Sequence, residues 1–100
     1  MHRVSLRGRP VEREVTLPSG RSVVIRVAVA ADAYLPRRER HTVTLELLAG
    51  DRVEATVNTV LAPSQVGEAN KLVDQVAMKL QSGELQPTAA AIEPLADSIP

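Results

Sequence analysis

Glu46 and Glu54 are the two residues whose type and spacing come closest to a catalytic pair. In the strand register derived below they lie directly opposite each other on the polar face of a hairpin. Paired carboxylates could serve general acid–base catalysis or bind a hard metal cation. No nucleophile or third ligand accompanies them, and like charges so placed repel each other. We therefore expect Arg52 and Arg26 to neutralise the pair rather than the pair to catalyse a reaction.

Other groups that commonly carry chemistry are sparse in this chain. His2 and His41 are its only imidazoles, and neither has a second ligand at metal-binding spacing. The chain has no cysteine, which excludes disulfides, thiolate metal ligands and thiol catalysis. Its five glycines are scattered and form no phosphate-binding loop. This pattern predicts a protein that is not an enzyme and that needs no metal or cofactor.

The densest charge cluster consists of Arg37, Arg38 and Arg40, in a segment that interrupts the strand pattern and is expected to form a loop. Guanidinium groups suit phosphates, so this cluster, together with Arg26, is the candidate phosphate or partner contact. The chain has a single aromatic residue and a net charge of zero. It therefore lacks the stacking platform and the basic balance of typical nucleic-acid-binding proteins, and nucleic-acid binding is the alternative function.

Charge and length set further limits. Residues 1–52 carry ten basic and six acidic residues, a balance of +4, and residues 53–100 carry a balance of −4. The simplest interpretation is basic strands and an acidic helix, each solvated; the alternative is a polar molecule that prefers acidic partners or pairs head-to-tail with itself. One hundred residues suit one domain. No signal-peptide or membrane-spanning run is evident, so we expect a cytoplasmic protein without membrane contact.

The elements that position these residues are clearest between His41 and Leu61, where apolar and polar residues alternate on both sides of 49–51. This period of two predicts a hairpin with one buried face. A two-residue loop would mix the faces, so the hydrophobic pattern favours a three-residue loop at 49–51. That loop sets three apolar pairs opposite each other: Leu47 with Val53, Leu45 with Ala55, and Val43 with Val57.

Five strands are expected in all: His2–Arg7, Val11–Leu17, Arg21–Ala30, His41–Leu48 and Arg52–Leu61. Pro18-Ser19-Gly20 suits a three-residue hairpin loop, with Gly20 in the left-handed conformation. Its register sets Val15 opposite Val23 and Val11 opposite Val27. Because the third strand is apolar on both faces, it is expected near the middle of the sheet.

A helix should follow the strands. Apolar residues recur at helical spacing from Val66 to Leu80, Ser64 is a suitable N-cap, and Gly83 is a natural stop. Gly67 lies in the first turn, so the helix could also start two or three residues later. The tail from Glu84 to Pro100 could form a short helix that covers a second apolar patch of the sheet, or it could stay free.

The predicted fold is therefore α+β: an antiparallel meander of about five strands, one long C-terminal amphipathic helix on one face, and a short C-terminal helical turn. Residues 1–83 are expected to form a single domain, with 84–100 as a tail. One helix leaves one apolar face uncovered, and such a face usually marks an interaction surface. We expect a non-enzymatic binding or assembly module, a homodimer, whose interface contains Val24, Ala28, Ala30, Leu48 and Val60. Strand addition at a sheet edge is a second route to a protein partner.

Overall fold

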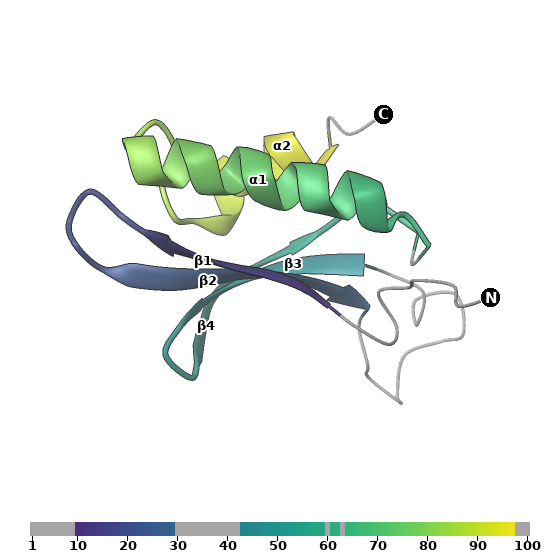
Figure 1. Ribbon diagram of the computed structural model, residues 1–100, viewed down its shortest axis with the longest axis horizontal. Helices are drawn as coiled ribbons and strands as arrows, with labels where there is room; N and C mark the ends of the chain where they lie inside the picture. Colours follow the sequence, from purple (N-terminus) through teal and green to yellow (C-terminus); the bar gives the residue numbers. More distant parts are fainter. Residues whose placement is uncertain (1–9, 30–42, 60, 63, 98–100) are drawn as a thin grey trace.

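The computed structural model describes residues 10–29, 43–59, 61–62 and 64–97. Its elements are β1 (Val11–Thr16), β2 (Ser22–Val29), β3 (Val43–Ala49), β4 (Arg52–Asn58), α1 (Val66–Ser82) and α2 (Ala89–Asp97). The strands form one antiparallel sheet in the order β1-β2-β3-β4, and both helices lie on the same side of it (Figure 1). The α+β meander is confirmed, with four strands among the described residues rather than five. The predicted strand His2–Arg7 lies outside them.

The first hairpin has the predicted register. The amide of Gly20 donates to the carbonyl of Leu17 at 2.9 Å, and Gly20 has a φ of 89°. This left-handed conformation is the one that a three-residue loop requires at its last position. The apolar pairs follow as predicted: Val15 with Val23 and Val11 with Val27. The second strand of this hairpin, β2, lies in the interior of the sheet, as its two apolar faces predicted.

The predicted register of the second hairpin is wrong. Its turn contains only Gly50 and Asp51, because Ala49 pairs with Arg52 and Leu48 pairs with Val53. Gly50 has a φ of 63°, as the first central position of a type II′ turn requires.

A β-bulge explains how so short a turn is compatible with the hydrophobic pattern. The register shifts between Leu47 and Leu48, so Glu54 is one extra residue in β4, and Leu47 pairs with Ala55. The extra residue returns the later apolar residues of β4 to the buried face, which a two-residue turn alone would not do. Val53 precedes the shift and therefore lies beside Leu48, on the opposite face from Leu47.

The core lies between the sheet and the two helices. Its buried sheet residues include Val23, Ile25, Val27, Val43, Leu45, Leu47, Ala55 and Val57. Helix α1 contacts β1 and β2, whereas α2 contacts β4 and α1. A helix is about 10 Å wide and strands lie about 4.8 Å apart, so a four-stranded face needs a second helix. The two residues of α2 that face this core, Ile92 and Ala96, are 0% exposed.

The C-terminal tail therefore covers the same face of the sheet as α1, not the second apolar patch. The predicted domain boundary at residue 83 stays a prediction.

Helix α1 has the predicted extent and buried face. Its N-cap residue is Gln65 rather than Ser64, without a side-chain capping hydrogen bond. Gly67 lies within the first turn, so the later start is excluded. A Cβ at Gly67 would meet no atom within 4 Å, so this glycine serves no close approach to a strand. Gly83 ends the helix with a φ of 84°, as predicted.

Candidate functional site

The candidate site is the outer face of the sheet, which is the face turned away from both helices (Figure 1). Strand pairing sets its side chains in rows that run across the sheet. The apolar row consists of Val24, Leu48 and Val53, with Glu14 at its β1 end. The charged row consists of Glu12, Arg26 and Glu46, with Thr56 at its β4 end. A third row contains Ala28, Thr44 and Asn58.

The apolar row carries the unusual exposure. Val24 and Leu48 are partly buried, and Val53 is 50% exposed. Among the described residues, Val53 and Met78 are the large hydrophobic side chains that are exposed. The structure thus brings Val24, Ala28 and Leu48 of the predicted interface to one face, whereas Ala30 and Val60 lie outside the described residues. Val53 was not among the predicted interface residues, because a three-residue loop would have placed it in the core. The Gly50-Asp51 pair, which is typical of a two-residue hairpin turn, was the sequence feature that could have indicated its true position.

The charges of the charged row are only partly paired with one another. The Nε atom of Arg26 is enclosed, lies 3.8 Å from Oε2 of Glu12 and has no hydrogen-bond partner among the described residues. Glu46 is the cross-strand neighbour of Arg26, yet within the described parts of the chain it forms no ion pair. Arg26 therefore lies beside Glu46 on the neighbouring strand, but the two do not form the ion pair that was predicted to neutralise Glu46.

The predicted pair of Glu46 and Glu54 does not form. Glu46 lies opposite Thr56, and Glu54 forms an ion pair with Arg21. The reason is the bulge, because Glu54 is its extra residue and no longer stands opposite β3. A hydrogen bond from Arg21 lowers the pKa of Glu54 below its ordinary value, and partial desolvation opposes this shift. The same hydrogen bond raises the pKa of Arg21.

This ion pair predicts a small pH dependence of stability. A carboxylate whose pKa is lowered by folding stabilises the protein above its unfolded pKa, and this contribution disappears as the pH falls through the folded value. At neutral pH, Glu54→Gln should therefore lower the melting temperature slightly, because the pair is exposed and screened by solvent. Well below the ordinary pKa of 4.5, both proteins should melt together. A difference that persists in acid, in thermal scans of both proteins, would contradict this assignment.

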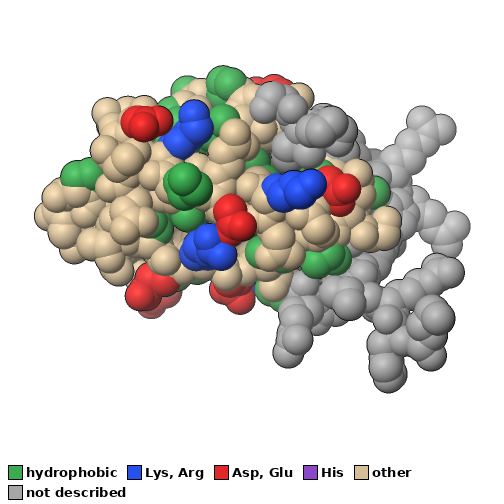
Figure 2. Space-filling model, turned by 45° about the horizontal axis from the view of Figure 1, so that its top comes forward, with side chains coloured by type: hydrophobic (Ala, Val, Ile, Leu, Met, Phe, Trp, Pro, Cys, Tyr) green, Lys and Arg blue, Asp and Glu red, His purple; other side chains and the backbone are tan. Residues whose placement is uncertain are grey.

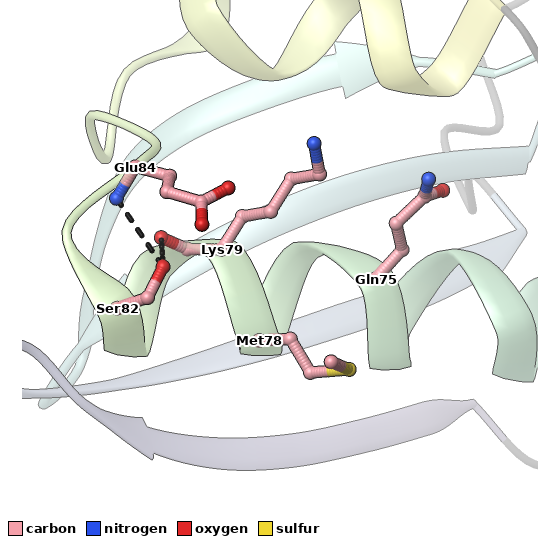
Figure 3. Close-up of a pocket in the computed structure, with 5 residues that line it drawn as sticks. All are labelled: Gln75, Met78, Lys79, Ser82 and Glu84. Atoms are coloured by element: carbon pink, nitrogen blue, oxygen red, sulfur yellow. Dashed lines mark hydrogen bonds between the residues drawn. The ribbon is translucent and has the colours of Figure 1, made fainter.

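Among the described residues, two of the concavities lie at the C-terminal end of α1, and neither assembles a catalytic group. One, of about 220 Å³, is lined by Gln75, Met78, Lys79, Ser82 and Glu84 (Figure 3). The Ser82 hydroxyl there donates to the Lys79 carbonyl at 3.1 Å and accepts from the Glu84 amide at 3.4 Å, so it serves the end of α1. The other, of about 410 Å³, is lined by Leu17, Pro18, Ser19, Arg21, Leu80, Gly83, Leu85, Gln86 and Pro87. It is mainly apolar and has no nucleophile beside a base.

The described residues form no continuous patch of one kind on the surface that faces the viewer in Figure 2. Acidic and basic side chains are interspersed there, and hydrophobic side chains emerge as separate spots (Figure 2). Within the described ranges, no group of three or more His, Cys, Asp or Glu residues could hold a metal ion. The described helices also include none that could span a membrane, given their length and hydropathy.

Only one residue of the predicted arginine contact lies within the described residues. Arg37, Arg38 and Arg40 lie outside the described residues, and Arg26 lies in the charged row of the outer face. Comparison of the chain with protein-family models, curated proteins and solved structures finds no match. The function of this chain must therefore be argued from its own surfaces.

Proposed function

We propose that this protein is a small, non-enzymatic assembly module that binds a protein partner, first of all a second copy of itself, through the outer face of its sheet. The observation that carries the proposal is the apolar row, in which a half-exposed valine continues two partly buried residues across three neighbouring strands. Burying apolar area is worth about 25 cal/mol per Å², so a matching surface on a partner would be bound there.

The edges of the sheet are weaker candidates than its face. The β1 edge carries three consecutive charged residues, Glu12, Arg13 and Glu14. Arg13 points toward the helix side, where its half-exposed guanidinium forms an ion pair with Asp74 of α1. The β4 edge contains the bulge at Glu54. Charges and bulges are the features that prevent strand addition at sheet edges, so a partner is expected on the face.

Nucleic-acid binding through Arg37, Arg38 and Arg40 is the alternative. Arg26 is the described member of that set, and its neighbours in the row are Glu12 and Glu46. Two carboxylates beside it disfavour a phosphate there, which supports the protein-binding proposal. Fluorescence anisotropy with labelled DNA and RNA separates the two functions, because binding that depends on phosphates weakens steeply as salt rises.

The proposal is tested by comparing Val53→Asp with Met78→Asp. Both side chains are exposed, at 50% and 71%, so both variants should fold, which thermal scans would check. Only Val53 lies on the outer face, where the substitution removes the exposed apolar side chain of the row and places a charge beside Leu48. In sedimentation equilibrium over a concentration series, the wild type and Met78→Asp should associate, and Val53→Asp should stay monomeric.

Two outcomes would overturn the proposed self-association. One is a wild-type protein that is monomeric at every concentration reached. The other is equal association of the two variants, because the outer face would then take no part in it.

A further inference from the structure

Resting on the proposed function, we infer that two copies pack outer face against outer face about a two-fold axis that runs parallel to the strands, between β2 and β3. In this arrangement Arg26 of each copy forms an ion pair with Glu46 of the other. The occupant of the face is thus a second copy of this chain, and the charged row sets its orientation.

Symmetry leaves few alternatives. Two identical sheets that pack face to face as a closed dimer are related by a two-fold axis lying in the plane between them. Aligned packing keeps the strands of both sheets within about 30° of each other. The axis therefore runs either along the strands or across them.

An axis along the strands pairs unlike groups. With this axis, β2 of one copy lies over β3 of the other and β1 lies over β4. Each row of side chains then lies over the same row of the partner. Arg26 then faces the partner's Glu46, and Val24 faces the partner's Leu48, each twice by symmetry. At the margin Glu12 and Glu14 face the partner's Thr56 and the partner's Val53, from an edge strand where a carboxylate can remain in solvent.

An axis across the strands places each strand over its own copy. If it passes through the charged row, Arg26 faces the partner's Arg26 and Glu46 faces the partner's Glu46, and such like-charge contacts oppose association. If it passes through the apolar row, Val24, Leu48 and Val53 each face their own copy, but Arg26 and Glu46 then lie level with the partner's Ser22 and the partner's Gly50, and neither meets an opposite charge. Charge complementarity therefore favours the axis along the strands.

Arg26 and Glu46 are incompletely paired within one copy of the chain. The Arg26 side chain is 40% exposed, and its contact with Glu12 runs through the enclosed Nε atom at 3.8 Å, so a partner can meet the exposed part of its guanidinium. Glu46 is partly buried and has no ion pair within the described residues. Packed sheets lie about 10 Å apart, a distance that an arginine and a glutamate span together. The face measures roughly 23 by 19 Å from the spacings of residues and strands, so the interface is small, and association should be weak and concentration-dependent.

Charge reversal and mixing test the arrangement. Arg26→Glu alone and Glu46→Arg alone each place like charges across the axis, so each should self-associate at least about tenfold more weakly than the wild type. Mixed in equal amounts, the two variants should form a heterodimer of near wild-type affinity, because both contacts across the axis are then complementary. Glu14→Arg reverses a marginal charge of the same face and is the matched control, with little change expected. Sedimentation equilibrium on the full chain gives the wild-type affinity and the four affinities that are compared with it.

The single variants and the mixture together separate this inference from its alternatives. With the axis across the strands through the charged row, the wild type already opposes like charges, so the mixture would bind more tightly than the wild type instead of matching it. Arg26 and Glu46 are also neighbours within one chain, but mixing leaves those internal contacts unchanged, so recovery on mixing must come from contacts between copies. If the wild type associates, Val53→Asp does not, and mixing fails to restore affinity, the inferred axis is wrong and the proposed function stands. A wild type that is monomeric throughout would refute both.

Discussion

Leu45→Ala is expected to lower the free energy of unfolding by about 2–5 kcal/mol, because it removes three carbon atoms from a fully enclosed site. Leu45 is 0% exposed and lies in the interior strand β3. Its cross-strand neighbours Val27 and Val57 are also buried, so little can move in to fill the space. The total free energy of unfolding of a domain is about 5–15 kcal/mol, so this substitution would remove a large share of it.

Leu48→Ala is the matched control for Leu45→Ala. It makes the same chemical change in the same strand, but Leu48 is on the outer face and only partly buried. Its cost should be below about 1.5 kcal/mol in dilute protein, because less apolar area is returned to water. Urea unfolding followed by circular dichroism measures both, since the chain has no tryptophan. Equal costs for the two variants would show that the sheet does not have one buried and one outer face.

Ile92→Ala is expected to cost about 2–4 kcal/mol, because Ile92 is 0% exposed where α2 packs against the sheet. Glu93→Ala, at the exposed neighbouring position, should change stability by no more than about 0.5 kcal/mol. The cost of Ile92→Ala cannot exceed the net free energy of docking α2, since the helix would otherwise detach. Urea unfolding of the two variants provides the comparison.

A chain that ends at Gln86 measures that docking energy directly. It should be at least as unstable as Ile92→Ala, because it lacks every contact of α2 with β4 and α1. This experiment also tests the predicted domain of residues 1–83. Wild-type stability in the shortened chain would establish that boundary and make α2 an accessory element.

The first hairpin and α1 were predictable because short-range chemistry decides them. Pro18 and Gly20 select the odd-membered loop, and that loop alone sets Val15 opposite Val23. The helical spacing of Val66 to Leu80 and the stop at Gly83 likewise depend on neighbouring residues. The predicted register of the second hairpin was wrong because short-range chemistry does not decide it. A two-residue turn with a bulge and a three-residue loop without one both bury Leu47 and Ala55. They differ in the face of Val53 and in the pairing of β4, which shifts by two residues.

The sequence by itself determined the four described strands and the helix α1, and the apolar side of each apart from Val53, because these properties depend on periods of two or 3.6 residues along the chain. Only the tertiary structure decided the register of β4, the position of α2 beside α1, and the presence of Val53 on the outer face. These depend on how wide a face the sheet presents and on where an extra residue can be accommodated. Such quantities arise between elements, so no local spacing specifies them.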